Sequence, residues 1–270
     1  MKKVWSIYFS GTGTTERVVR ALATMLEKRL ELERGEVNFT FKKNREKKYS
    51  FSKEDIVVVG TPVIAGRVPN LLLEFLRSLE GNGALAIPIV MFGNRDYDDA
   101  LIELKDILEE DSFVVVGAGA FVGEHSFSTK LGAGRPDSSD FEILETLGER
   151  IIGRVKEKRY LSEKIVVKGE KPYRWYYQPR DSKGNPIDIR KVKPKTDMAL
   201  CTNCGYCVEI CPLSSIEKDS VDIVSGICMK CCACVKRCPQ KAKYFDDKNF
   251  NYHKEELELE YSRRAEVEIF

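Results

Sequence analysis

The sequence predicts two domains: a doubly wound α/β domain with a parallel sheet, followed by a small cysteine-rich α+β domain. The first observation is a series of apolar, strand-like runs that alternate with segments of helical periodicity in the N-terminal half. The second is that loops rich in Gly, Thr, Pro and Asn follow three of these runs. The third is a cysteine pattern that occurs twice between Cys201 and Pro239. A chain of 270 residues has room for two such domains.

The first strand is expected over Val4–Phe9, and the loop S-G-T-G-T-T follows it at once. Apolar side chains then recur at helical spacing from Val18 to Leu30. Such a loop at a helix start is an anion site, because free amides point at the anion and hydroxyls add donors. The loop lacks the lysine of a nucleotide-triphosphate loop and the third glycine of a dinucleotide fingerprint. It is therefore predicted to hold a terminal phosphate through neutral donors; an ordinary helix cap is the alternative.

The next two strands are expected over Val37–Phe41, near a sheet edge, and over Ile56–Gly60. Ile56–Gly60 is apolar throughout, which is typical of a strand covered on both faces. It leads into the loop Thr61–Pro69, and a helix with an apolar stripe follows at Leu72–Leu79. Because ligands of open α/β sheets bind beyond the carboxyl ends of the strands, this loop is a second candidate binding segment.

The fourth strand is expected over Ile89–Phe92, with Pro88 at its start, since proline is rarely found inside a central strand. The loop Gly93–Asp99 follows, before a helix with leucines at helical spacing. In this loop Tyr97 is predicted to stack on a planar ring, and packing at the helix start is the alternative.

The fifth strand is expected over Phe113–Phe121. His125 lies just beyond it and is a candidate to line the same site, although a lone histidine is often satisfied locally. Asp137 is expected to cap a final helix, whose apolar stripe reaches Val155.

The cysteine-rich stretch reads C-x-x-C-x-x-C-x-x-x-C-P and then repeats this pattern. Thiolates at this spacing are the ligand set for two [4Fe–4S] clusters. Three cysteines in a short turn hold one cluster, and the fourth, which lies beyond a helix start, serves the other cluster. The predicted sets are Cys201, Cys204, Cys207 and Cys238 for one cluster and Cys228, Cys231, Cys234 and Cys211 for the other.

Other uses of these cysteines fit the pattern less well. Structural zinc usually shows two C-x-x-C pairs with a long spacer, and a disulfide framework needs an oxidising compartment. The ninth cysteine, Cys232, falls outside the pattern and is interpreted as a bystander thiol. Reduced metal-ligand cysteines, with no signal peptide at the N-terminus and no apolar run that could span a bilayer, predict a cytoplasmic protein. The net charge of +2 gives no indication of a nucleic-acid partner.

Composition divides the chain into four segments. The predicted bounds are 1–160 for the α/β domain, 161–196 for a basic linker rich in Pro and aromatic residues, 197–245 for the cysteine-rich domain and 246–270 for a C-terminal tail. The aromatic residues of the linker are expected to pack between the domains. For the tail, a strand, a helix or docking on a partner all remain open.

The chain as a whole resembles a flavodoxin–ferredoxin fusion family of anaerobes. The resemblance covers nearly all of the chain and implies the strand order 2-1-3-4-5, bound FMN in the first domain and a ferredoxin-like module with two clusters. The second loop departs from the pattern, because it lacks the aromatic residue that many flavodoxins place there. The FMN-binding residues that the resemblance implies are Ser10, Thr12, Gly13, Thr14 and Thr15 in the first loop, Thr61, Pro62 and Val63 in the second, and Gly93, Asn94 and Tyr97 in the third.

The function implied by this resemblance is electron transfer between FMN and two [4Fe–4S] clusters. Its expected partners are redox proteins, with donor and acceptor unspecified and a homodimer left open. No catalytic residue is predicted, because the sequence shows no nucleophile, base or oxyanion set. Two alternatives are a flavin-dependent reductase of a small substrate such as a quinone, and a non-catalytic iron–sulfur protein whose α/β domain is a docking or sensing module.

Overall fold

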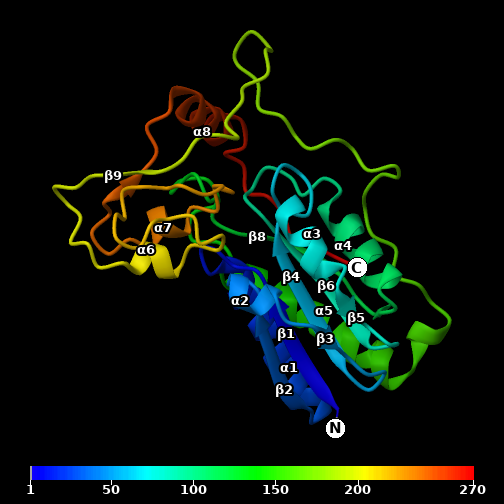
Figure 1. The fold of residues 1–270 in the computed structure, drawn as a ribbon. Helices are drawn as coiled ribbons and strands as arrows, with labels where there is room; N and C mark the ends of the chain where they lie inside the picture. Colours follow the sequence, from blue (N-terminus) through cyan, green and yellow to red (C-terminus); the bar gives the residue numbers. More distant parts are fainter. Residues whose placement is uncertain (1) are drawn as a thin grey trace.

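The computed structural model describes residues 2–270, which form a larger α/β domain beside a smaller cysteine-rich domain (Figure 1). Five parallel strands make the core sheet, in the order β2-β1-β4-β6-β8. Counted along the chain, this is the predicted order 2-1-3-4-5, and the predicted doubly wound fold is confirmed. The strands are β1 (Lys3–Tyr8), β2 (Glu33–Asn38), β4 (Ile56–Pro62), β6 (Leu85–Phe92) and β8 (Gly119–Val122).

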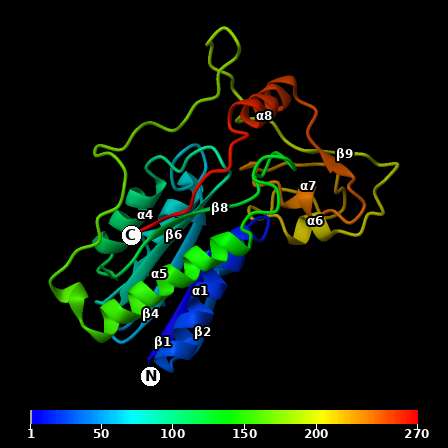
Figure 2. The same cartoon turned by 180° about the vertical axis from the view of Figure 1, so that it is seen from behind.

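Helices cover both faces of this sheet. Helices α1 (Thr14–Leu30) and α5 (Ser138–Lys156) lie next to each other on one face, as Figure 2 shows. The opposite face carries the 3-10 turn η1 (Asn70–Leu72) and helices α3 (Leu73–Leu76) and α4 (Ala100–Glu110). Successive residues of β4 alternate between these two cores, so an uninterrupted apolar run is what this strand requires.

Short elements fill the connections of the first domain. They are α2 (Lys42–Arg45), β3 (Tyr49–Ser50), β5 (Leu79–Glu80), β7 (Val114–Val115) and the 3-10 turn η2 (Arg159–Leu161). The expected fifth strand is thus broken into β7 and β8. Gly117 lies in the break, where a Cβ would come within 2.7 Å of the Ile151 side chain on α5.

The expected start of the fourth strand was wrong. β6 begins at Leu85, and Pro88 lies inside it, paired with Val59. On its other side β6 pairs with β7 at residues 85–86 and with β8 at 89–92, so Pro88 faces the gap between them. The Val116 amide donates to the Ala86 carbonyl, which shows that this side is the one where Pro88 would need an amide hydrogen. The missing hydrogen therefore falls at the break between β7 and β8 and interrupts no strand pairing.

The C-terminal tail contains both a helix and a strand. Helix α8 (Lys248–Glu260) lies above the sheet edge, and β11 (Glu268–Ile269) pairs antiparallel with β8 (Figure 1). Arg135, itself buried, forms an ion pair with Asp140 and donates to the carbonyl of Ala265. The last residues of the chain therefore belong to the sheet of the first domain.

The cysteine-rich domain is small and has little regular structure. It contains α6 (Tyr206–Glu209), α7 (Ala233–Lys236) and the antiparallel pair β9 (Lys195–Thr196) and β10 (Lys243–Tyr244). Its two halves repeat the same backbone. Equivalent positions take positive φ in both copies: Asn203 and Lys230, Gly205 and Cys232, Ser214 and Lys241.

The linker lies along the first domain. The Tyr173 hydroxyl donates to Asp106 on α4 at 2.5 Å, and Arg174 pairs with the buried Asp99 at 2.6 Å. Trp175, in contrast, is 95% exposed, so the linker aromatics do not all pack as expected. Across residues 2–270, the structure has no helix that is both long and apolar enough to cross a bilayer.

Helix α4 ends at a carboxylate that the fold does not accommodate well. Burial raises the pKa of Asp111 to about 6, and its Oδ2 has no hydrogen-bond partner within the described chain. A negative charge at a helix C-terminus is also unfavourable. As pH rises from about 4 to about 6, the unfolded chain ionises this group before the folded one does, so stability is lost in that window.

We therefore expect Asp111→Asn to stabilise the protein at pH 7.5 by about 1 kcal/mol, allowing for partial exposure, and to raise Tm by about 2–4 °C. Thermal unfolding followed by circular dichroism measures this. Glu110→Gln, at an exposed neighbour, should change Tm less. An equal gain for Asp111→Asn at pH 3.5 would contradict the explanation.

Candidate functional site

The first cysteine set surrounds one cavity. Its four thiols line this cavity together with Thr196, Val221 and Lys243, which come from β9, the connection between the repeats and β10. Cys204 is exposed, so this cavity lies at the surface of the domain. The amide of Asn203 donates to the Cys201 sulfur at 3.4 Å. The thiols that line the cavity are Cys201, Cys204, Cys207 and Cys238.

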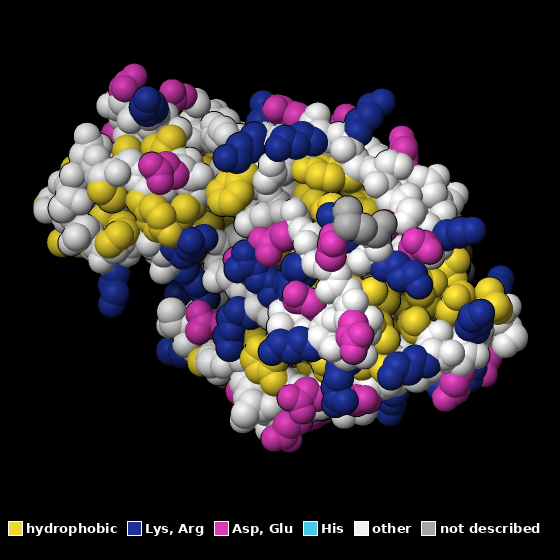
Figure 3. All heavy atoms as spheres, turned by 90° about the horizontal axis from the view of Figure 1, so that it is seen from below, with side chains coloured by type: hydrophobic (Ala, Val, Ile, Leu, Met, Phe, Trp, Pro, Cys, Tyr) yellow, Lys and Arg dark blue, Asp and Glu magenta, His cyan; other side chains and the backbone are white. Residues whose placement is uncertain are grey.

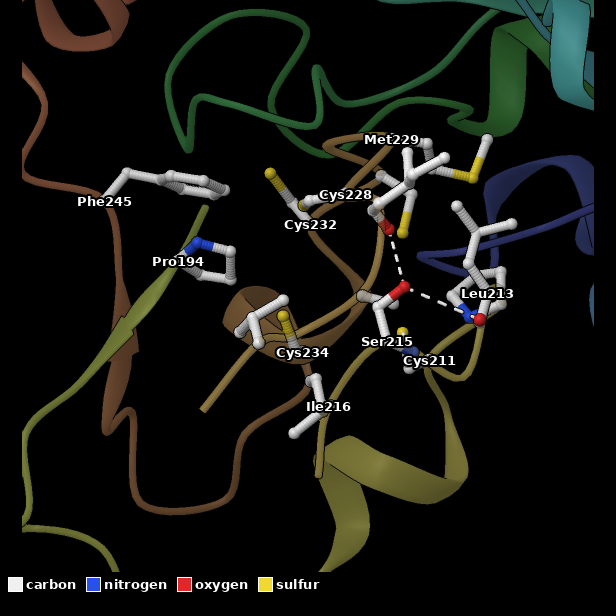
Figure 4. A pocket seen from close by; sticks show the side chains of 15 residues that line it. Pro194, Cys211, Leu213, Ser215, Ile216, Cys228, Met229, Cys232, Cys234 and Phe245 are labelled. Atoms are coloured by element: carbon white, nitrogen blue, oxygen red, sulfur yellow. Dashed lines mark hydrogen bonds between the residues drawn. The ribbon is translucent and has the colours of Figure 1, made fainter. Parts of the chain in front are cut away.

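The second set surrounds another cavity, which has apolar walls formed by residues such as Ile216 and Phe245 (Figure 4). Burial raises the pKa of Cys231 and of Cys234 to about 12. Thiols with such high pKa values are protonated at neutral pH, so a metal group that binds thiolates must displace those protons. The thiols of this set are Cys211, Cys228, Cys231 and Cys234.

Two short helices connect the cavities. Cys207 on α6 lines the first cavity, and Cys211, one turn later, lines the second. In the other copy, Cys234 on α7 lines the second cavity, and Cys238, one turn later, lines the first. Four residues of helix advance about 6 Å, so the cavities are close neighbours. The two sets that the fold brings together are the two sets predicted from the spacing.

The donor chemistry of both cavities fits an iron–sulfur cluster, since four thiols and few competing ligands are what a [4Fe–4S] cluster needs. The amides of Ser215 and Ala242 donate to the sulfurs of Cys211 and Cys238, each at 3.3 Å. Among the residues that the structure describes, no three His, Cys, Asp or Glu side chains form a group that could hold a single metal ion.

Cys232 occupies the position of Gly205 in the other copy of the repeat. Both residues have positive φ and lie at the start of a short helix. The Cys232 side chain is buried, and its thiol lies 3.5 Å from the carbonyl oxygen of Lys230. This residue also lines the second cavity, but it is a fifth cysteine there and has no counterpart in the first.

The second cavity lies against the first loop of the α/β domain. A Cβ placed on Gly11 would be 3.1 Å from the Cβ of Cys231 and 3.5 Å from its sulfur. Glycine allows this approach, because any side chain would press on the cysteine. The loop predicted to hold a phosphate is therefore in contact with a predicted cluster ligand.

Polar contacts hold the domains in this arrangement. Lys236 on α7 donates to the Glu124 carboxylate at 2.5 Å and to the carbonyls of His125 and Ser128 at 2.6 and 2.7 Å. Arg45 donates to the carbonyl of Pro212 at 2.6 Å. Each copy of the cysteine repeat is thus tied to the carboxyl edge of the sheet (Figures 1 and 2).

The first loop retains features of an anion site. The Ser10 hydroxyl accepts from the amides of Gly13 and Glu16, at 3.1 and 3.2 Å. Gly13 has φ 97°, a conformation that glycine adopts most easily. The amides of Thr14 and Thr15 begin α1 and have no acceptor inside the helix. Thr12 is half-buried beside them, so these residues fit a terminal phosphate group.

The second loop is more constrained. Thr61 is fully buried, and its hydroxyl has no hydrogen-bond partner within residues 2–270. Pro62 ends β4, and Val63 packs on the core. Farther along this loop, the carbonyls of Ala65 and Gly66 accept from Tyr177 in the linker and from Asp99.

The third loop differs most from its prediction. Asn94 is buried and holds the C-terminal tail: its Nδ2 donates to the carbonyls of Tyr261 and Arg263, at 2.7 and 2.6 Å, and its Oδ1 accepts from the Ala265 amide. Tyr97 is 1% exposed, and its hydroxyl donates to Glu268 in β11.

Tyr97 consequently offers no free ring face for stacking. Its surroundings agree better with the alternative interpretation, in which Tyr97 packs at the helix start. The ring of His125 covers Gly93, where a Cβ would lie 2.2 Å from its Cδ2. Burial, followed by the nearby Lys236, lowers the pKa of His125 to about 3. The neutral ring accepts from the Phe127 amide, so His125 is satisfied locally.

The fit to FMN is therefore partial. The first loop suits its phosphate, whereas the third-loop residues named for its ring contact the tail and His125 instead. Gly11, Lys236 and Arg45 were not predicted as site residues, because their roles depend on contacts between domains that no local pattern reveals.

A doubly wound domain and a cysteine domain with two cavities, each lined by one predicted set of four thiols, define a flavodoxin-like fold joined to an iron–sulfur module. Residues 194–217 match the family model of the 4Fe-4S binding domain. No curated protein matches the chain. These are the two parts that the resemblance to flavodoxin–ferredoxin fusions implies.

Solved structures similar to this chain include flavodoxins. One from the domain Archaea has 17% identity, covers 58% of this chain and 99% of its own, and has a TM-score of 0.41. One from Streptococcus pneumoniae has 20% identity, coverage of 57% and 98%, and a TM-score of 0.40. One from Fusobacterium nucleatum, bound to flavin mononucleotide, has 18% identity, coverage of 58% and 99%, and a TM-score of 0.37.

The hydrogen bonds of Asn94 to residues 261–265 predict that this side chain holds the C-terminal tail on the first domain. Asn94→Gly removes three hydrogen bonds without adding backbone strain, because φ is 68° there. We expect a loss of about 2–3 kcal/mol in the free energy of unfolding by urea, and faster proteolysis at residues 261–267. Asn82→Gly, at an exposed residue with φ 48° whose side chain donates to Ser50 and Phe51, is the matched control and should leave proteolysis at residues 261–267 unchanged. Unchanged proteolysis in Asn94→Gly would show that the tail is held elsewhere.

Proposed function

We propose that this chain is an electron-transfer protein in which FMN at the carboxyl edge of the sheet exchanges electrons with two [4Fe–4S] clusters. The observation that carries the proposal is the contact between Gly11 and Cys231, which sets the predicted phosphate loop against the second thiol set. Clusters transfer single electrons at low potential, and a flavin accepts one or two.

In this proposal, the phosphate loop and the two thiol sets each bind a different cofactor. Ser10 and Thr12–Thr15 would hold the phosphate, and the half-buried second set would take the cluster nearer to the sheet. The first set would take the outer cluster, where Cys204 is exposed to a partner protein. Positive and negative side chains are interspersed over the face seen in Figure 3, and hydrophobic ones gather on the cysteine-rich lobe at its left.

The proposal is tested by the composition of protein purified without air. We expect about eight iron and eight sulfide per chain, four of each for every cluster, and about one FMN. Iron and sulfide assays, visible absorption and flavin extraction measure these quantities. Zinc in place of iron would overturn the assignment of both cavities.

Single cysteine variants separate ligands from the bystander. Cys204→Ala should reduce iron from about eight to about four per chain, since one cluster loses a ligand. Cys232→Ala, which removes a buried thiol of the second cavity, should retain about eight. A loss of iron in Cys232→Ala equal to that in Cys204→Ala would contradict the ligand sets.

The covered third loop favours a second candidate function. Asn94 and Tyr97 hold the tail, so the α/β domain could act as a docking platform for an iron–sulfur protein that binds no flavin. Full iron content with no flavin in anaerobically purified protein, and no FMN uptake by equilibrium dialysis, would favour this function over the first.

A further inference from the structure

Lys243 is an unusual residue beside the first thiol set. Within residues 2–270 it is the only lysine with a buried side chain, at 3% exposure. It lies in β10 and lines the first cavity together with Cys207 and Val221. Its ammonium donates to the carbonyl of Val221.

A buried ammonium requires a counter-charge, because a single carbonyl replaces little of the lost hydration. Two acidic residues near this strand pair have other partners: Asp246 forms an ion pair with Lys195 at 2.7 Å, and Asp197 accepts from the Ala199 amide. The thiol of Cys207 lines the same cavity as Lys243 and can carry negative charge. A thiolate-bound cluster in the first cavity would supply the missing negative charge.

The internal repeat provides a comparison inside the same chain. Lys243 follows Cys238 at the same interval as Ile216 follows Cys211. Ile216 is likewise buried and lines the second cavity, where Figure 4 shows it near Cys234. Equivalent positions of the two repeats thus hold a buried lysine at the first cavity and a buried isoleucine at the second.

We propose that Lys243 is the counter-charge of the cluster held by the first thiol set and makes that cluster the more easily reduced of the two. This inference rests on the proposed function. Reduction adds one electron, and hence one negative charge, to a four-thiolate cluster, with no bond made or broken. A nearby fixed positive charge stabilises the product more than the reactant, and burial limits the screening by solvent.

The two lysines beside the second set do not line its cavity. Lys230 is partly exposed and donates to the carbonyls of Arg190 and Cys228, and Lys236 is paired with Glu124. Exposure of Cys204 to water also favours the reduced form at the first cavity. An electron that enters the protein would consequently settle on the outer cluster, at the surface that a partner can reach.

The test is a reductive titration of the full chain with dithionite, followed by electron paramagnetic resonance. Lys243→Gln removes the charge and keeps a donor for the Val221 carbonyl. Lys243→Met is the second variant. Lys241→Gln, at an exposed lysine of the same segment, is the matched control. Cys204→Ala, which retains only the second cluster, identifies which reduction step belongs to it.

We expect two steps in the unmodified protein, the easier one being absent from Cys204→Ala. In Lys243→Gln the ratio of reduced to oxidised outer cluster at a fixed potential should fall about tenfold, equal to 59 mV for one electron, and the other step should stay within twofold. Lys241→Gln should leave both steps within twofold. Specific loss of about four iron in both Lys243 variants would also support the counter-charge.

Three results would overturn the inference. One is full iron content with both steps unchanged in Lys243→Gln, which leaves the proposed function intact. Another is loss of the fold in both variants, which would make Lys243 a structural residue. The third is the finding that the unmodified protein binds no iron, in which case the proposed function fails first.

Discussion

The architecture of the cysteine-rich domain depends on the exchange of the fourth cysteine between its two halves. Each cavity takes three thiols from one copy of the repeat and the last from the other, because a single helical turn separates Cys207 from Cys211 and Cys234 from Cys238. Neither half can complete a four-thiol set alone, so a metal group held by these sets would couple its binding to the association of the halves. This explains how a domain with two short helices and one strand pair can keep a defined shape.

The position of this domain follows from a second constraint, the close approach of Gly11 to Cys231. The carboxyl edge of a doubly wound sheet is where ligands bind, and here that edge also receives the iron–sulfur module. Lys236 and Arg45 fix the orientation with bonds to backbone carbonyls. One edge of the sheet thereby combines an anion loop, a domain contact and the anchor of the tail.

Much of this could be predicted from the sequence because the signals are local. The cysteine spacing defines both thiol sets, and the apolar runs define the parallel sheet. The failures were nonlocal: Pro88 is tolerated because a neighbouring strand breaks opposite it. Tyr97 is covered because residues at the far end of the chain return to it. Lys243 stands out only when the two copies of the repeat are compared in three dimensions.

The pairing of β11 with β8 has a further consequence for the behaviour of the protein in a crowded solution. An outer strand with unpaired backbone groups is a template for self-association between molecules. Here the chain's own terminus occupies that template, and the buried Arg135 holds the preceding residues in place. Shortening the chain by a few residues would uncover it, so solubility and the integrity of the C-terminus are linked.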